Sequence, residues 1–410
     1  MPSQTDRALF KRLARRQAGR VTMVRPSQLN GFTPTAEAVL HGRGVRYSSI
    51  GRHADLHPNW LRDQSQAPGQ VEATNRQRLF TPRDIAADLA VTSCDLDGEH
   101  LVVGFSDGHV ARIDTVLVER RLGWLFDDEE PPAPEPWTTP LERFPYVDWN
   151  EIGWSLDGED TDAVIEFLSA FYRHGYVVLR NTPTVEGTLR RITDRLGYIV
   201  GNNFGWIFDV RAEPNPTDLA YTSIELLAHT DQPYRRPVPG IQLLHCLRNE
   251  SPGGDSTLVD GLAAANALLA EHPDLHTALV ETEVEFRYDM GTDTVVSRGP
   301  ILEYDCLGRY RQIRFNTKLD NPVLRPGADL DGYYAGRRWL LDWLNDPAHQ
   351  VTFRLEPGDV MLMDNHRALH GRTQFDSSRG HRHLQGAYID HDGPDTMYRL
   401  AVRRRASMSA

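Results

Sequence analysis

The stretch Pro357-Gly-Asp-Val-Met-Leu-Met-Asp-Asn-His366-Arg-Ala-Leu-His370-Gly-Arg372 contains the features that decide the fold. Its Pro-Gly-Asp turn starts a short apolar strand over residues 360–363, and His370 closes that strand in a polar setting. Earlier in the chain, we predict further short strands over residues 175–179, 241–246, 311–315 and 351–355, and helices over 160–174, 262–269 and 333–344. Short strands separated by turn residues indicate a mainly β fold with flanking helices, built as a sandwich or barrel.

Composition narrows the class of protein. The 410 residues include 57 acidic and 45 basic side chains, for a net charge of −12. This balance excludes a dedicated nucleic-acid binder, whose affinity depends on neutralising phosphates. Three single cysteines (Cys94, Cys246 and Cys306) cannot form a disulfide framework or a CxxC-type zinc site. No apolar run reaches the ~18 residues needed to cross a bilayer. We therefore expect a cytoplasmic enzyme with no membrane partner.

The chain divides by composition into four parts. Residues 1–35 are a basic leader, which we expect to be flexible. Residues 36–126 form a small β-rich domain, with a hairpin over residues 101–113 that turns at Ser106-Asp-Gly108. Residues 127–140 are acidic and rich in proline, as expected of a linker. Residues 141–410 form the larger domain, in which we expect the chemistry.

Candidate metal ligands follow from strand geometry. A mononuclear iron(II) site for oxygen chemistry uses two imidazoles and one carboxylate and leaves the opposite face open. A His-x-Asp string on a strand points both side chains to one side. Three such strings occur, beginning at His53, His229 and His272. Only His229-Thr-Asp231 opens the strand-rich half, so we select His229 and Asp231.

The third ligand and a cosubstrate residue are expected downstream. By itself, His370 is also consistent with a core histidine that caps a strand. Arg382 follows it by 12 residues and suits the distal carboxylate of 2-oxoglutarate, because a guanidinium pairs with a carboxylate through two hydrogen bonds. A surface ion pair is the alternative for Arg382. Together, His229, Asp231, His370 and Arg382 in this order indicate an iron(II) and 2-oxoglutarate site.

Five segments carry a family resemblance. They are His229-Thr-Asp-Gln-Pro, Pro239-Gly-Ile-Gln-Leu-Leu-His-Cys246, Gly253-Gly-Asp-Ser-Thr-Leu-Val-Asp-Gly261, Asp364-Asn-His-Arg-Ala-Leu-His-Gly371 and Arg382-His-Leu-Gln-Gly-Ala-Tyr388. They resemble the γ-butyrobetaine dioxygenase branch of the taurine dioxygenase (TauD/TfdA) superfamily, over about residues 145 to 405. More weakly, His57-Pro-Asn-Trp-Leu-Arg-Asp63 resembles the amino-terminal β domain of that branch.

The resemblance implies a double-stranded β-helix (jelly-roll) that hydroxylates an unactivated C–H bond with Fe(II), 2-oxoglutarate and O2. By position, His229, Asp231 and His370 would be the iron ligands and catalytic residues. Arg382 would hold the distal carboxylate of the cosubstrate, and Ser256 would supply a cosubstrate-binding hydroxyl. The family also makes ascorbate a candidate reductant and a homodimer a candidate assembly.

Two departures from the family are visible. Gln64-Ser-Gln-Ala-Pro-Gly-Gln70 stands where animal members carry a cysteine cluster for zinc. We therefore expect no structural zinc, and we expect His109 to be a surface residue of the hairpin. In the pocket, Gln232 stands where the resemblance leads us to expect tyrosine.

The resemblance also implies an aromatic cage in the substrate pocket, which would hold a trimethylammonium group through cation–π interactions. Phe204, Phe208, Tyr221 and Tyr388 fall at cage-like positions, with Trp206 nearby, although such rings are equally consistent with core packing. At the other end of the pocket, Asp218, Arg314 and Asn316 stand near positions where the family uses asparagines. An aspartate repels a carboxylate and an arginine holds one more strongly than an amide does. We therefore expect a small cationic or zwitterionic substrate, such as a quaternary amine, an amino acid or an aminophosphonate.

The sequence is also compatible with other functions. The same iron site could carry out desaturation or cyclisation, and a non-catalytic jelly-roll binding protein is a remoter alternative. Halogenation is disfavoured because Asp231 occupies the position that a halide needs. A zinc hydrolase is disfavoured because no helix carries His-Glu-x-x-His.

Overall fold

The computed structural model describes residues 36–125, 128–138, 141, 144–154, 160–211, 222–291 and 293–408. The predicted leader over residues 1–35 lies outside the described residues. The chain forms two compact units, Met1–Asp128 and Glu129–Ala410. No helix in the described ranges is both long and apolar enough to cross a membrane.

The first unit contains two antiparallel three-stranded sheets. One consists of β1 (Glu37–His41), β2 (Gly44–Ser49) and β3 (Arg52–Leu56), and the other of β4 (Val91–Asp97), β5 (His100–Phe105) and β6 (Val110–Asp114). Short helices α2 (Pro58–Asp63), η2 (Pro82–Asp84) and α3 (Thr115–Arg121) complete it. The β5–β6 pair confirms the predicted hairpin. Alternate residues along it, such as Leu101 and Val103, are buried in one core.

His109 differs from its expected surface position. Its side chain is half-buried, and its Nε2 lies 2.8 Å from the Oγ of buried Ser65. Ser65 belongs to the Gln64–Gln70 segment that stands in place of the family's cysteines. A hydrogen bond therefore joins this segment to the hairpin.

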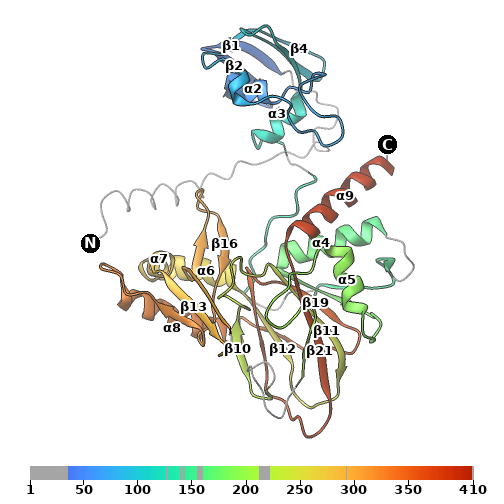
Figure 1. Cartoon of the computed structure of the whole chain (residues 1–410), viewed down its shortest axis with the longest axis vertical. Coiled ribbons are helices and arrows are strands. Elements are labelled where there is room, and N and C mark those ends of the chain that lie inside the picture. Colours follow the sequence, from blue (N-terminus) through green and yellow to red (C-terminus); the bar gives the residue numbers. More distant parts are fainter. Residues whose placement is uncertain are drawn as a thin grey trace. The chain divides into compact units, whose positions relative to one another are not determined.

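Two facing sheets lie at the centre of the second unit, and together they make a double-stranded β-helix (Figure 1). The six-stranded sheet has the order β7 (Tyr146–Asp148), β8 (Tyr176–Arg180), β19 (Val360–Asp364), β11 (Ile241–Asn249), β21 (Arg382–Ile389), β9 (Phe208–Val210). The four-stranded sheet has the order β10 (Leu226–His229), β20 (Ala368–Arg372), β12 (Ser256–Asp260), β18 (Val351–Phe353). β7 and β8 pair in parallel, and the other registered pairs of the two sheets are antiparallel. This confirms the mainly β jelly-roll fold.

β19 shows why the sequences of the central strands are uninterrupted runs of apolar residues. Val360 and Leu362 point into the core beneath the helices, whereas Met361 and Met363 point into the core between the two sheets. Side chains alternate along a strand, so a strand covered on both faces must be apolar at every position.

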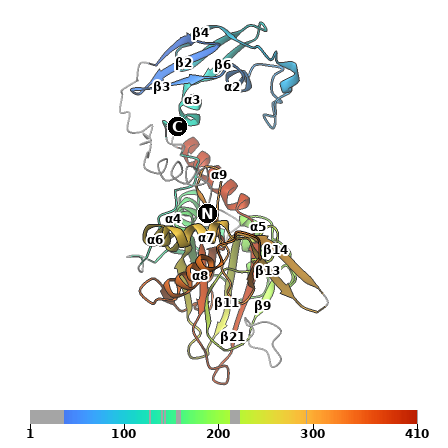
Figure 2. The same ribbon diagram turned by 90° about the vertical axis from the view of Figure 1, so that its left-hand side faces the viewer.

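Helices cover the outer sides of both sheets (Figures 1 and 2). The six-stranded sheet packs against α4 (Thr161–His174), α5 (Thr188–Leu196) and α9 (Asp392–Met408). A further core beside β10, β12 and β20 involves α6 (Gly261–Glu271), α7 (Pro273–Glu281), α8 (Leu330–Leu344), β13 (Val284–Asp289), β14 (Thr294–Gly299), β15 (Leu302–Tyr304) and β16 (Tyr310–Ile313). β17 (Asp320–Pro322) pairs with β13. The helices begin and end near the predicted limits because capping residues lie there. Asp160 caps α4 at its start, and Gly175 ends it with a φ of 76°.

Two predicted features differ in the structure. The apolar strand ends at Asp364, and His370 lies on the next strand, β20, in the other sheet. The described part of the expected linker lies against the second unit. There the Trp137 side chain is buried and its Nε1 donates to the carbonyl of His174 at 2.8 Å.

Candidate active site

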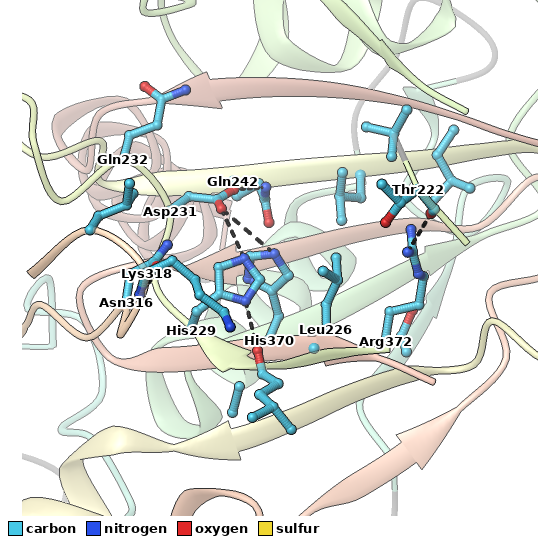
Figure 3. A pocket seen from close by; sticks show the side chains of 18 of the residues that line it. Thr222, Leu226, His229, Asp231, Gln232, Gln242, Asn316, Lys318, His370 and Arg372 are labelled. Atoms are coloured by element: carbon cyan, nitrogen blue, oxygen red, sulfur yellow. Dashed lines mark hydrogen bonds and ion pairs between the residues drawn. The ribbon is translucent and has the colours of Figure 1, made fainter. Parts of the chain in front are cut away.

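The predicted histidine and aspartate ligands meet at one point of the second unit. His229 ends β10, Asp231 follows two residues later, and His370 lies opposite His229 in the antiparallel register of β10 and β20. The Oδ1 of Asp231 is 3.4 Å from His229 Nε2 and 3.8 Å from His370 Nε2. The two imidazole centroids are 4.4 Å apart. Thus three ligating atoms converge from segments remote in the sequence (Figure 3).

Electrostatics keep this group in the protonation states that ligate a metal. Burial would raise the pKa of Asp231, but His370, His229 and the Tyr388 hydroxyl lower it well below its usual range. Burial lowers the pKa of His370 to about 4, against the opposing effect of Asp231. The Nδ1 of His229 donates to the carbonyl of Leu227 at 2.9 Å, so Nε2 carries the lone pair. At neutral pH Asp231 is therefore a carboxylate and His370 a neutral imidazole, which are the forms that bind a metal.

Three side chains that the sequence did not single out for this role orient Asp231. Gln242 on β11 donates to Asp231 Oδ2 through its amide, and Tyr388 on β21 donates to the same oxygen at 2.6 Å. Asn365 holds the backbone of Asp231 from both sides, through Oδ1 and Nδ2. With Oδ2 engaged, Oδ1 is the oxygen that faces the histidines.

The metal-ligand group of His229, Asp231 and His370 lines a cavity of about 750 Å³. It contains most of the predicted site residues: His229, Asp231, His370, Arg382, Ser256, Phe204, Phe208, Gln232, Asn316 and Tyr388. In Figure 3, Thr222 and Arg372 lie on one side of the two histidines and Asn316 and Lys318 on the other. The metal-ligand group thus separates two polar regions of one cavity.

The first region contains two arginines. Burial lowers the pKa of Arg382 to about 10, and burial together with the charge of Arg382 lowers the pKa of Arg372 to about 10. Among the described residues, the buried Nε of Arg382 has no hydrogen-bond partner. Ser256 is buried opposite Arg372 in the register of β12 and β20. Two guanidiniums in a low-dielectric pocket favour an anionic ligand.

The second region is aromatic with a cationic side chain. The rings form a chain of contacts: Phe208 and Tyr388 are stacked at 5.5 Å, Phe204 lies 6.1 Å from Phe208 and 6.0 Å from Tyr288, and Tyr234 stacks on Tyr288 at 4.9 Å. All five rings line the cavity. The same lining includes Lys318, whose side chain is exposed.

Gln232 is unusual in conformation and surroundings. Its backbone has a φ of 49°, in the left-handed region that most side chains avoid. Both polar atoms of its buried amide lack a hydrogen-bond partner among the described residues. A strained residue with an unsatisfied amide in a cavity is typical of a ligand contact.

Two predicted substrate residues lie elsewhere. Trp206 is 63% exposed and covers Gly201, and it is not among the residues that line the cavity. Arg314 is buried outside the cavity lining, where it donates to Ser297 Oγ at 3.2 Å and lies over the Phe286 ring. β16 ends at Ile313, so strand alternation does not carry Arg314 to the side that Asn316 faces. Asp218 and Tyr221 lie outside the described residues.

Sequence reasoning missed several lining residues. Arg372 follows His370 by two positions on β20, so strand alternation alone could have indicated it. Lys318 is one of only two lysines in the chain, which is a weak signal. Tyr234 and Tyr288 meet through a tertiary contact between distant segments, which a single sequence does not reveal.

The fold and site define a class of protein: an oxygenase-type jelly-roll with a two-histidine, one-carboxylate group in its cavity. The family model described as "Taurine catabolism dioxygenase TauD, TfdA family" matches residues 143–388. The chain belongs to this family, in its γ-butyrobetaine dioxygenase-like branch.

Two relatives in sequence support that placement. The chain is 33% identical over 387 residues to a γ-butyrobetaine dioxygenase of Pseudomonas sp. (strain AK-1), with 91% of this chain and 97% of the relative covered. It is 28% identical to a trimethyllysine dioxygenase of Meyerozyma guilliermondii, with 83% and 89% covered. A solved asparagine oxygenase matches 60% of this chain and 93% of its own, at 21% identity and a TM-score of 0.46.

Proposed function

We propose that this chain is an Fe(II)- and 2-oxoglutarate-dependent dioxygenase that hydroxylates a small zwitterion bearing a quaternary ammonium group, and that residues 141–410 carry the chemistry. The observation that carries the proposal is the convergence of His229 Nε2, Asp231 Oδ1 and His370 Nε2 in the cavity. Two imidazoles and one carboxylate with an open side suit non-haem Fe(II).

The side chains of the proposed ligands, and the groups that orient them, fit a metal ion. His229, Asp231 and His370 would hold Fe(II), which with 2-oxoglutarate and O2 supplies the oxidising power for C–H hydroxylation. The contacts from Gln242 and Tyr388 fix the rotamer of Asp231, and the Leu227 carbonyl fixes the tautomer of His229. Such outer contacts orient metal ligands and raise metal affinity.

The arginine region fits the cosubstrate. Arg382 would pair with the distal carboxylate of 2-oxoglutarate, and its unsatisfied Nε supports this role. Ser256 and Arg372 line the same region. Because both guanidiniums are buried, a dicarboxylate bound there would gain more than it would at an exposed site.

The opposite region fits the substrate. A chain of five aromatic rings offers π faces to a quaternary ammonium group, which is the group present in the substrates that name the γ-butyrobetaine and trimethyllysine dioxygenase relatives. Lys318 and Asn316 would receive an anionic group at the other end of the substrate. Arg314 would not take part in that contact, because it lies outside the cavity lining.

The experiment is a succinate assay with Fe(II), 2-oxoglutarate and O2 across trimethylammonium carboxylates, amino acids and aminophosphonates. We expect succinate to form in step with a product that has gained one oxygen atom, and fastest with a trimethylammonium carboxylate. A product that has lost two hydrogens would identify desaturation or cyclisation. Absence of succinate with every compound would contradict the proposal.

A further inference from the structure

A second group of two histidines and one aspartate lies outside the cavity lining. It consists of Asp364 at the end of β19, His366 in the following turn and His391 between β21 and α9. One ligating atom from each lies within 4.8 Å of the other two. In the described part of the chain, this group and the active-site group are the two that have metal-binding geometry.

We propose that Asp364, His366 and His391 form a second, structural site for a divalent cation of the zinc type. Two imidazoles and a carboxylate are a donor set that Zn²⁺ accepts, with water as the fourth ligand. The site is reachable from solvent, because the side chains of His391 and Asp364 are 32% and 22% exposed.

The orientations of the rings suit this role. His366 Nε2 lies 3.1 Å from the Val238 carbonyl and so carries the proton, which leaves Nδ1 with the lone pair. His391 Nε2 lies 3.1 Å from Asp364 Oδ1, and the two imidazole centroids are 5.0 Å apart. A cation would replace the proton shared by His391 and Asp364 and would draw in His366.

The proposed cation site lies next to residues that hold the active site in place. Asn365, which holds the backbone of Asp231, stands between two of the proposed ligands. The carbonyl of His366 also accepts from the Ile313 backbone at 2.9 Å and from the Tyr310 hydroxyl at 2.9 Å. A cation bound to Asp364 and His366 would therefore stiffen the turn that positions an active-site ligand.

Zinc stoichiometry tests the proposal independently of catalysis. The metal-free full chain is titrated with ZnCl2 by calorimetry, and bound zinc is counted by elemental analysis after dialysis. We expect two zinc ions per chain in the wild type, and one each in His229→Ala, His366→Ala and His391→Ala. The double variant His229→Ala/His391→Ala should bind none. His383→Ala is the matched control, because His383 pairs with Asp209 at 2.7 Å outside either group, and it should keep two.

The melting temperature is a second readout, which distinguishes the loss of a zinc site from misfolding of a variant. Zinc should raise the melting temperature of His229→Ala, since a ligand that binds only the folded state stabilises it, and His391→Gln added to that background should abolish the rise. Zinc binding to the wild type that His391→Ala leaves unchanged in stoichiometry, together with no zinc bound to His229→Ala, would show that Asp364 and His391 form only an ion pair. Failure of the proposed oxygenase activity would not alter either outcome.

Discussion

The side chain of Asn365 forms hydrogen bonds with both the backbone N–H and the backbone carbonyl of Asp231. Its Oδ1 accepts from the Asp231 N–H at 2.7 Å, and its Nδ2 donates to the Asp231 carbonyl at 3.0 Å. The same Nδ2 donates to the Pro239 carbonyl at 2.9 Å, and the residue is fully buried. A primary amide offers one acceptor oxygen and two donor hydrogens, which match the one N–H and the two carbonyls bonded here. Asn365 therefore holds the proposed aspartate ligand in place without belonging to the ligand group.

Replacing this amide should damage both stability and metal binding. Asn365→Ala leaves the Asp231 N–H and two carbonyls without their partner, at about 1 to 3 kcal/mol for each unsatisfied buried group. We expect the free energy of unfolding to fall by about 3 kcal/mol or more, the lower end of that sum, and Mn²⁺ affinity to fall about 10- to 100-fold. Urea unfolding and calorimetry measure the two quantities. Asn249→Ala, which removes a buried amide bonded to the Leu355 carbonyl, should lower stability and leave metal affinity unchanged.

The Tyr388 hydroxyl should matter for the metal more than for folding. Tyr388→Phe keeps the ring that stacks on Phe208 and removes the 2.6 Å hydrogen bond to Asp231 Oδ2. We expect Mn²⁺ affinity to fall about 10-fold with a change of about 1 kcal/mol in stability. Tyr304→Phe is the control, because it removes a hydroxyl bonded to His276 outside the cavity lining. Equal metal affinities in both variants would refute the orienting role.

Lys318 should discriminate between substrates by charge. Because its side chain is exposed, its contribution is modest, about 1 kcal/mol. Lys318→Met should therefore raise KM for a trimethylammonium carboxylate about 5-fold, leave KM for 2-oxoglutarate unchanged, and have no effect on a substrate lacking the carboxylate. Steady-state kinetics at two salt concentrations provides the measurement, and the wild-type advantage should shrink at high salt. An equal loss for both substrates would contradict an ionic contact.

Stability should fall in mild acid because of buried neutral histidines. Burial lowers the pKa of His245 and of His276 to about 4, against about 6.5 in the unfolded chain. Between these values the unfolded chain binds more protons, so stability is full above pH about 6.5 and is lost as the pH falls toward about 4.

A variant isolates one of these groups. His276→Gln should reduce the loss of unfolding free energy between pH 7 and pH 5 by about 2 kcal/mol, because the remaining side chain does not titrate. Urea unfolding at both pH values measures the difference. His53→Gln, the same substitution at an exposed position, supplies the matched control. A His276→Gln variant with wild-type dependence would show that this imidazole does not set it.

The regular parts of the fold were predictable from local pattern. Apolar runs such as residues 360–363 mark strands covered on both faces, and Asp160 with Gly175 marks the limits of α4. The sequence pattern places His370 at the end of the same apolar strand, but the turn over residues 365–367 carries the chain from one sheet to the other. Such a change of sheet leaves no periodic signal in the residues.

The site was predictable only in part, for a related reason. A ligand motif names the groups that touch the metal, and the structure brings His229, Asp231 and His370 together. The residues behind them, Gln242 and Asn365, act through geometry that depends on two sheets facing each other. Arg314 and Asn316 are two positions apart, yet one is buried beside Phe286 and the other lines the cavity, because no regular strand continues through them.

The central claim is that the group at His229, Asp231 and His370 binds a metal to which 2-oxoglutarate adds. Anaerobic calorimetric titration of 2-oxoglutarate into the full chain, with and without Fe(II), tests it most directly. We predict one 2-oxoglutarate bound per chain only when Fe(II) is present, none in His229→Ala, and affinity about 10- to 100-fold lower in Arg382→Ala. Binding of equal affinity without metal, or in His229→Ala, would contradict the claim.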